Sequence, residues 1–296
     1  MRICLLTPEP DHPLLAATAA LLTPHHRVES LDPATVDPAT LGPDTVADVY
    51  LLKSRTPRAL ALAAHLEALG APVVNSAAAT GQLQDRTAMA RTARAAGLPF
   101  VATRTVASVG ELTGPGGLTA ADFPLVVKSR HSRRHDLVAR ADDLTRLRQL
   151  ADDRPDEPLV VQPFAPNNGW DQKIWVIAGQ VFAARRRSEL ADAERGPAHP
   201  LPPAELPAER IDLVLRVGEV FALDVYGVDL LDGPGEPLIV DVNAFPGIRG
   251  QAGAPEALAA LALRTARSGP PAPPAQAVRE PAQPPARPAG TPATSR

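Results

Sequence analysis

The sequence predicts an α/β layer followed by an α+β region of two subdomains, with a C-terminal tail that has no core of its own. Three observations predict this division. Short apolar runs alternate with helical segments in residues 1–80, which is typical of a parallel sheet covered by helices. From residue 123 onward, apolar segments of strand length are separated by polar or glycine-containing stretches. After residue 267 the chain consists mostly of Pro, Ala and Arg.

The first layer opens with a short apolar strand over residues 3–6, which is followed at once by turn residues. Further along we expect a helix over 14–22, a strand over 46–52, a helix over 59–69 and a short strand over 73–75. Gly70 ends the second helix and Pro72 follows it, which is a typical helix stop. These elements define an N-terminal α/β domain, residues 1–80.

A linker helix over 85–96 stops at Gly97 and Pro99, and the pattern changes there. Beyond it we expect strands over 125–128, 159–164, 225–231 and 238–242, a hairpin over 173–184, helices over 141–151, 211–221 and 255–267, a Pro-rich loop over 196–207, and a turn at 232–235. We assign residues 81–267 to one domain, with subdomains over about 81–160 and 161–267.

The composition argues against several kinds of function. A net charge of -3 gives no chain-wide attraction to nucleic acid, and 3% aromatic residues provide no stacking platform. The one cysteine, Cys4, lies in an apolar run and is interpreted as a core residue. No apolar run reaches membrane-spanning length, so we expect a cytoplasmic protein without a membrane or nucleic-acid partner. Residues 268–296 cannot bury enough apolar surface to offset their ordering entropy and are expected to be a disordered tail.

The most informative pattern is a pair of strands that carry polar oxygens. Asp241 and Asn243 alternate along an apolar strand, so their side chains share a face, and Asp229 on the partner strand can face them. Burying these groups among Ile, Val and Leu is costly without a cation. Three oxygen ligands suit Mg²⁺ that also takes phosphate oxygens from a nucleotide. The alternative interpretation is a set of surface polar residues near turns.

The segments 228–231 and 240–247, which read Val-Asp-Leu-Leu and Val-Asp-Val-Asn-Ala-Phe-Pro-Gly, resemble the metal-binding segment of ATP-grasp enzymes. They are similar to RimK-like carboxylate-amine ligases and also to inositol trisphosphate kinases. The resemblance implies a pre-ATP-grasp-like α/β domain followed by an ATP-grasp domain that sandwiches ATP. It also implies that Asp229, Asp241 and Asn243 hold Mg²⁺, with Mn²⁺ as an alternative ion.

Upstream segments resemble the same family in the same order. The resemblance assigns nucleotide binding to Lys128, Gln162, Pro163, Phe164, Ala165 and Lys173, and catalytic charge to Lys173, Arg186 and Arg187. Within this set the lysines and arginines would face phosphates or substrate, and residues 162–165 would line the base pocket. The other interpretations are an exposed strand-end lysine, plain core residues and a solvated charge run.

Two departures from the ligase pattern stand out. The loop Ser129–Asp136 contains no glycine, whereas most RimK-like ligases have a Gly-rich loop there. Its charged side chains would replace backbone contacts to phosphate, unless it is a solvated basic loop; they are His131, Arg133, Arg134 and His135. The pair Asp85-Arg86 replaces the Asp-Lys of typical ligases and resembles the inositol kinases.

The resemblance implies an ATP- and Mg²⁺-dependent ligase that forms an amide or peptide bond through an acylphosphate. One alternative is a small-molecule kinase of the inositol phosphate kinase type, and another is a non-catalytic nucleotide-binding protein. The substrate would be a small molecule or peptide with a carboxylate or hydroxyl acceptor. The sequence pattern specifies neither the oligomeric state nor the identities of the acceptor and the amine.

Overall fold

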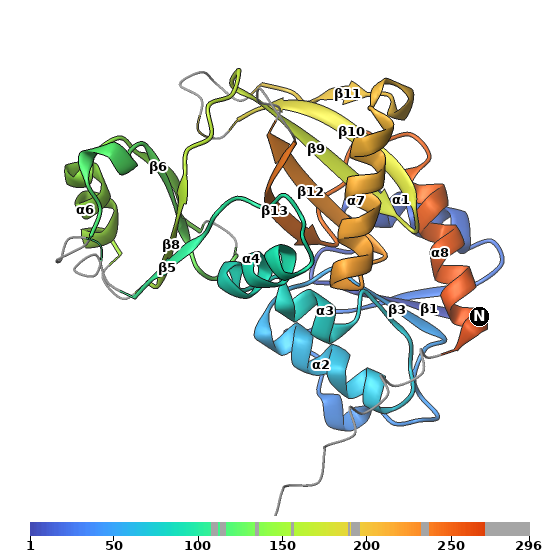
Figure 1. Cartoon of the computed structure of the whole chain (residues 1–296). Helices are drawn as coiled ribbons and strands as arrows, with labels where there is room; N and C mark the ends of the chain where they lie inside the picture. The colour runs from blue at the N-terminus through green and yellow to red at the C-terminus, as the bar shows by residue number, and fades with distance from the viewer. Residues whose placement is uncertain are drawn as a thin grey trace, which may run out of the picture.

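The first layer of the computed structural model is a parallel sheet of four strands in the order β2-β1-β3-β4 (Figure 1). Its elements are β1 (Arg2–Leu6), α1 (Pro13–Leu22), β2 (Arg27–Leu31), the 3-10 turn Pro38–Thr40, β3 (Val49–Leu52), α2 (Pro57–Ala68), β4 (Val73–Val74) and α3 (Ala77–Gln82). The buried strands β1 and β3 are the apolar runs of the sequence, because a parallel sheet is covered on both faces. The structure describes residues 1–107, 112, 117–133, 136–154, 157–188, 190, 196–231 and 237–269.

A second sheet forms the smaller lobe that stands to one side in Figure 1. Helix α4 (Arg86–Ala95) leads to its antiparallel strands, which run in the order β5-β8-β6-β7. The elements of this lobe are β5 (Arg104–Val106), the 3-10 turn Ala120–Asp122, β6 (Leu125–Ser129), β7 (Val138–Ala141), α6 (Leu144–Asp152) and β8 (Leu159–Pro163). Helix α6 buries Leu147 and Leu150 in one cluster with Val127 and Val161 of the sheet. One face of the sheet is therefore covered by α6.

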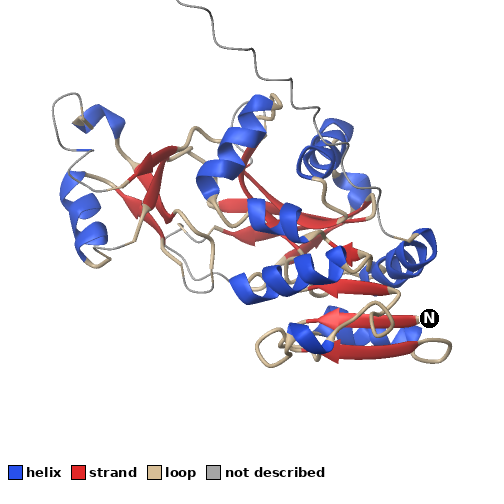
Figure 2. Cartoon of the chain, turned by 90° about the horizontal axis from the view of Figure 1, so that it is seen from below, coloured by secondary structure: helices blue, strands red, loops and turns tan. Residues whose placement is uncertain are grey.

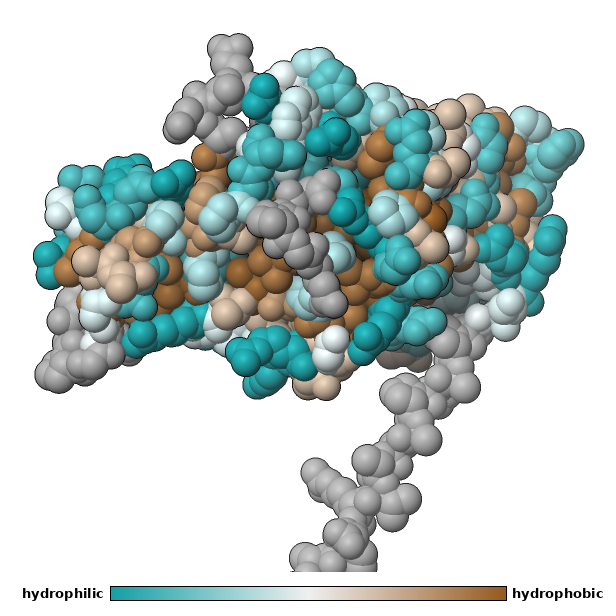
Figure 3. Space-filling model, turned by 45° about the horizontal axis from the view of Figure 1, so that its top comes forward, coloured by the Kyte–Doolittle hydropathy of each residue, from teal (hydrophilic) through white to brown (hydrophobic). Residues whose placement is uncertain are grey.

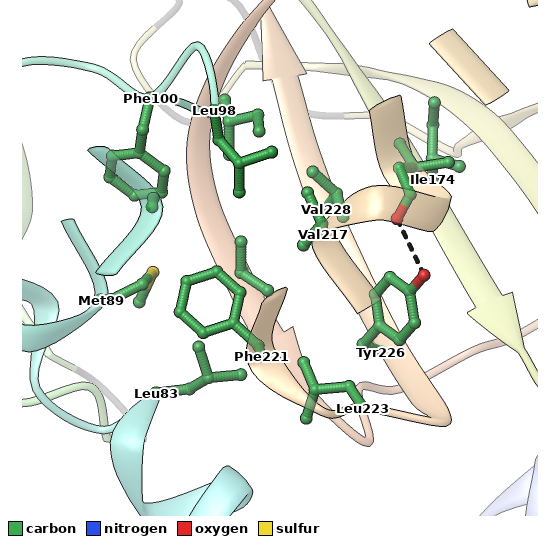
Figure 4. Packing of buried hydrophobic residues seen from close by; sticks show 14 of the residues in the cluster. Leu83, Met89, Leu98, Phe100, Ile174, Val217, Phe221, Leu223, Tyr226 and Val228 are labelled. Carbon is green, nitrogen blue, oxygen red and sulfur yellow. Dashed lines mark hydrogen bonds between the residues drawn. The ribbon is translucent and has the colours of Figure 1, made fainter. Parts of the chain in front are cut away.

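The third sheet is antiparallel and has five strands in the order β11-β10-β9-β12-β13. Its elements are β9 (Trp170–Ile177), β10 (Gln180–Arg187), β11 (His199–Leu201), the 3-10 turn Pro203–Glu205, α7 (Ala208–Phe221), β12 (Val225–Leu231) and β13 (Leu238–Ala244). Helix α7 covers one face, and Figure 4 shows Phe221 of α7 packed between Met89 of α4 and Leu223. This packing joins the linker helix to the large sheet.

The N-terminal sheet and the five-stranded sheet share one hydrophobic core. Leu5 and Leu51 of the first sheet lie in the same buried cluster as Trp175 of β9 and Leu258 of α8 (Ala254–Ser268). Helix α8 lies beside α1, so the last helix of the chain covers the first layer (Figures 1 and 2). A polar contact adds to this, because buried Asn75 donates from Nδ2 to the carbonyl oxygen of Val225 at 2.7 Å.

Several predicted elements need correction. The helix expected over 141–151 begins only at Leu144, because residues 138–141 form β7 and pair with β6. The loop expected over 196–207 contains β11, and the edge strand β2 had no predicted counterpart. These strands are short and partly exposed, so they lack the apolar run that indicates a strand. The turn predicted at 232–235 and residues 270–296 of the predicted tail lie outside the described residues.

The surface and the single thiol complete this description. Within the described ranges, no helix combines the length and the apolar character that crossing a membrane requires. On the face that Figure 3 shows, hydrophilic residues surround apolar ones that are visible in the middle of the molecule. Cys4 is fully buried, and burial raises the pKa of its thiol to about 12, which confirms its assignment to the core.

Candidate active site

A cleft lies between the four-stranded sheet of the small lobe, β5-β8-β6-β7, and the five-stranded sheet. The volume of this cleft, including its solvent-filled opening, is about 1030 Å³. The described ionisable side chains along it are the cations Arg55, Arg86, Lys128, Arg133, Lys173 and Arg186 and the carboxylates Asp136, Asp171, Asp229 and Asp241. Cations outnumber carboxylates here although the whole chain has a net charge of -3. This local excess favours an anionic ligand.

The register of the large sheet places the predicted metal ligands side by side. Lys173 of β9 pairs with Asp229 of β12, and Asp229 pairs with Asp241 of β13. Asn243 lies two residues after Asp241, so it faces the same side of the strand. All of these residues line the cleft. The structure therefore brings the two acids and the amide to one cleft, and their role as metal ligands stays a prediction.

Each of these oxygen donors contacts a cationic side chain. Lys173 Nζ lies 2.8 Å from Asp229 Oδ1, and Arg86 Nη2 lies 3.4 Å from Asp241 Oδ2. Asn243 Oδ1 accepts a hydrogen bond from Arg55 Nη1 at 3.3 Å. Burial alone would raise the pKa of Asp241, but the neighbouring cations outweigh burial and lower it. The carboxylate is therefore held ionised, as a metal ligand must be.

The donor set fits Mg²⁺. Asp229, Asp241 and Asn243 supply only oxygen atoms, which are the ligands that Mg²⁺ prefers, and the open cleft leaves room for phosphate and water oxygens. Among the described residues, no group of three or more His, Cys, Asp or Glu side chains is placed to hold a metal. The site therefore depends on the Asn243 amide as its third protein donor.

Lys128 connects the two sides of the cleft. It extends from β6 of the small lobe, and its Nζ donates to the carbonyl oxygen of Val240 on β13 at 2.9 Å. Its side chain is buried, and burial lowers its pKa while Asp241 acts in the opposite direction. A buried ammonium that donates to a backbone oxygen is available to an anion entering the cleft.

The segment predicted to line the base pocket does line the cleft. Gln162 and Pro163 end β8, Phe164 and Ala165 follow it, and all four line the cleft. The Gln162 amide donates to Thr103 Oγ1 at 3.0 Å, so its side chain is already engaged. The Phe164 N–H donates to the carbonyl oxygen of Pro124 at 3.0 Å, which orders the end of the segment.

The glycine-free loop is tied to the start of α4. Arg130 reaches both oxygens of Asp85, the N-cap of α4, at 3.1 and 2.6 Å. Arg86 pairs with Asp136 at 2.7 Å and donates to the carbonyl oxygen of Ser129. Arg133 lines the cleft but pairs with Glu157. His131 is exposed and does not line the cleft. The other two predicted side chains, Arg134 and His135, lie outside the described residues. The loop is therefore held by ion pairs where a Gly-rich loop would rely on backbone contacts.

The two predicted catalytic arginines point to different places. Arg186 lines the cleft beside Asp171, its partner across the strands. Arg187 does not line it, and its guanidinium lies over the ring of Trp170 at 4.6 Å from the centroid. Successive residues on a strand point to opposite faces, so both arginines could not face one cleft. The assignment of Arg187 to the cleft is corrected accordingly.

Arg55 and Asp171 line the cleft although the sequence analysis did not select them. Arg55 comes from the N-terminal sheet, directly after β3 and before the N-cap Thr56 of α2. Ligand sites of parallel sheets lie at the carboxyl ends of strands, so the basic residues after β3 were a signal that could have found it. Asp171 could have been found by extending the hairpin predicted over 173–184 by two residues at each end, which places it opposite Arg186.

Comparison with solved structures identifies the class of fold. A RimK domain ATP-grasp protein from Sphaerobacter thermophilus has a TM-score of 0.67 and 23% identity, covering 89% of this chain and 100% of that chain. A D-alanine–D-alanine ligase from Bacillus anthracis in complex with ATP has a TM-score of 0.68 and 16% identity over 90% and 99% of the two chains. The ATP-grasp ligase PsnB with a minimal precursor, Mg and ADP has a TM-score of 0.65 and 18% identity over 90% and 97%. The chain has the ATP-grasp fold.

The sequence itself narrows this class. Residues 118–256 match the family model of the RimK-like ATP-grasp domain. The probable alpha-L-glutamate ligase of Rhodopirellula baltica is 33% identical over 95 residues, which are 31% of this chain and 24% of that protein. The ribosomal protein bS6–L-glutamate ligase of Salmonella paratyphi B is 34% identical over 96 residues, or 31% and 32%. The chain thus spans about a quarter to a third of the length of these curated relatives.

Proposed function

We propose that this chain is an ATP- and Mg²⁺-dependent carboxylate-amine ligase. One observation carries the proposal. Three neighbouring strands of the large sheet place four polar side chains side by side in one cleft: Lys173, Asp229, Asp241 and Asn243. Two acids and an amide hold a divalent cation, while lysines on both sides meet phosphate. The names of the relatives, which are ligases, support amide formation over other uses of ATP.

In this proposal the residues act by position and charge. Asp229, Asp241 and Asn243 hold Mg²⁺, which when bound neutralises phosphate charge and orients the transferred group. Lys128, Lys173 and Arg186 stabilise the negative charge that shifts as phosphoryl transfer proceeds. Residues 162–165 contact the base of ATP. Ion pairs already fix Lys173, so little reorganisation is needed when the nucleotide binds.

The chemistry consists of two transfers. A carboxylate oxygen of the acceptor bonds to the γ-phosphorus while the bond from that phosphorus to the bridging oxygen breaks, and ADP leaves. An amine nitrogen then attacks the acyl carbon, loses a proton, and phosphate leaves. We further propose that residues 1–80 are the pre-ATP-grasp domain, that Mn²⁺ can replace Mg²⁺, and that the protein acts in the cytoplasm on a small molecule or a peptide.

The products separate the ligase from its alternatives. The purified chain is incubated with ATP, Mg²⁺, pooled amino acids and acetylated dipeptides. A ligase releases ADP and phosphate together. A kinase of the inositol phosphate type, given a hydroxyl substrate, releases ADP without phosphate. Thermal stabilisation by MgATP without any turnover would indicate a nucleotide-binding protein and would contradict the ligase proposal.

Substitutions test the metal assignment. Asp241→Asn and Asn243→Ala are expected to lower the rate of ADP release on the order of 100-fold or more, because the first removes a negative charge from the cation site and the second removes an oxygen donor. The control is Asp212→Asn, which changes an exposed acid on α7 outside the cleft. Thermal unfolding without nucleotide checks that each variant is folded. The assignment is wrong if folded variants keep the full MgATP-dependent rise in Tm.

A further inference from the structure

Arg55 reaches the cleft from the N-terminal sheet, whereas the residues proposed to bind the nucleotide come from the other two sheets. It follows β3 at the carboxyl edge of the N-terminal sheet, and it comes directly before Thr56, the N-cap of α2. Its guanidinium contacts Asn243 at the end of the proposed metal site and Ser132 of the loop after β6, at 3.3 and 3.5 Å. It therefore lies where the N-terminal layer meets the cleft.

The neighbouring cations form ion pairs with carboxylates, and Arg55 does not form one with any described residue. Arg86 pairs with Asp136, Lys173 with Asp229, and Arg133 with Glu157, all at 2.8 Å or less. Both hydrogen-bond partners of Arg55 are neutral side chains, and both hydrogen bonds are long, at 3.3 and 3.5 Å. No carboxylate among the described residues forms an ion pair with Arg55. A half-buried guanidinium with weak neutral partners favours an incoming anion.

The surroundings of Arg55 are also positive. Lys53 lies two residues earlier, with Nζ at 3.4 Å from the carbonyl oxygens of Phe245 and Pro246. Burial, helped by the charges of Arg55 and Arg249 and opposed by Glu9, lowers the pKa of Lys53 to about 8. The N-terminal end of α2 adds the positive pole of a helix dipole next to Arg55.

We propose that Arg55 binds the acceptor carboxylate and thereby selects carboxylic acids, such as the C-terminus of an amino acid or peptide, as substrates. The planar guanidinium can hold one carboxylate through two parallel hydrogen bonds, and Asn243 keeps it beside the metal site. A carboxylate in this place would lie beside Asn243, one of the residues proposed to hold the metal. The inference rests on the ligase function proposed above.

The test compares two pools of probe compounds. One pool contains acetylated dipeptides with free C-terminal carboxylates, and the other contains the same dipeptides as C-terminal amides. Both are assayed for ADP release with MgATP and a mixture of amino-acid amides, which supply the amine but no α-carboxylate. The proteins compared are wild type, Arg55→Met, Arg55→Lys and the control Arg91→Met, which changes an exposed arginine of α4. The Tm shift caused by MgATP is measured for each variant without dipeptide.

In the expected result, wild type and Arg91→Met turn over only the carboxylate pool. Arg55→Met raises KM for that pool roughly 10- to 100-fold, because a charged hydrogen-bond pair is lost, and keeps the Tm shift with MgATP. Arg55→Lys recovers part of the loss. An unchanged KM in Arg55→Met overturns the inference, and so does a lost Tm shift, which would assign Arg55 to positioning Asn243. No carboxylate-dependent turnover by wild type overturns the ligase function itself.

Discussion

His12 is a buried titratable residue outside the cleft, at the N-cap of α1. Its Nδ1 accepts a hydrogen bond from the Leu14 N–H at 3.3 Å, and its side chain is 7% exposed. Burial lowers the pKa of His12 from 6.5 to about 4, and the charges of Lys53 and Arg249 contribute. The neutral form is therefore favoured in the folded state, and protonation would remove the acceptor of the cap.

This shift predicts a specific loss of stability in acid. Because the folded pKa is below the unfolded one, the contribution is complete above pH 6.5 and is lost as the pH falls towards 4. Its size is about 3 kcal/mol at most for a shift of this extent. His12→Asn keeps a cap acceptor but cannot titrate, so relative to wild type it should gain stability between pH 7 and pH 4 in urea unfolding. Exposed His25→Asn is the control, and equal pH slopes for His12→Asn and wild type would contradict the shift.

At the cleft, strand alternation and the family resemblance selected most of the predicted residues that line it, but the sequence analysis missed Arg55 and Asp171. Asp241 and Asn243 were found because strand alternation places both on one face. Arg187 was assigned to the cleft by resemblance, although alternation separates it from Arg186. Arg55 was missed because its role depends on how the first sheet docks against the third, and no local pattern encodes that docking.

Gly218 allows α7 to lie close against β12. A Cβ at this position would lie 2.6 Å from Cζ of Tyr226, whose ring is 2% exposed. The Tyr226 hydroxyl donates to the carbonyl oxygen of Val214 on α7 at 2.8 Å, the bond drawn in Figure 4. The ring is therefore fixed at both ends, by the sheet and by the helix, and cannot move aside for a methyl group.

We predict that Gly218→Ala destabilises the protein by roughly 1–3 kcal/mol, as overpacking does in a fixed core. Helix propensity alone predicts the opposite sign, a gain of about 1 kcal/mol. Gly42→Ala is the matched control, because nothing lies within 4 Å of a Cβ there, and it should change the stability by less than about 0.5 kcal/mol. Denaturant unfolding measures both, and a stabilised Gly218→Ala would show that the helix can move away.

The longer elements could be predicted from the sequence, and the short edge elements could not. Strands β6 and β12 and helix α2 bury continuous or periodic apolar residues, so their patterns are local. Strand β7 reads Val-Ala-Arg-Ala and pairs only with β6, so its existence depends on its partner. The helix predicted over 141–151 was placed three residues too early, because Ala141 ends β7 and the helix begins at Leu144.

At the scale of the whole molecule, the predicted boundary between residues 1–80 and the rest does not separate two cores. Leu51 of β3, Trp175 of β9 and Leu258 of α8 lie in one buried cluster. Asn75 adds buried hydrogen bonds, since its Oδ1 accepts the N–H groups of Asp224 and Val225 at 2.8 and 3.0 Å. The side of the cleft that carries Arg55 is therefore fixed relative to Asp241 and Asn243 by the same packing that stabilises the fold.

A core shared in this way predicts cooperative unfolding of the first and third sheets. The chain has two tryptophans, Trp170 and Trp175, and both lie on β9, so tryptophan fluorescence reports the large sheet. Leu51→Ala truncates a side chain that belongs to the N-terminal sheet, yet it should destabilise the fluorescence-detected transition by about 2–5 kcal/mol, as expected for a buried leucine. Leu21→Ala, at a leucine that is 46% exposed, is the control and should leave the transition nearly unchanged. If residues 1–80 unfolded as an independent domain, Leu51→Ala would lower the circular dichroism midpoint of that part alone and leave the fluorescence transition where it is in wild type.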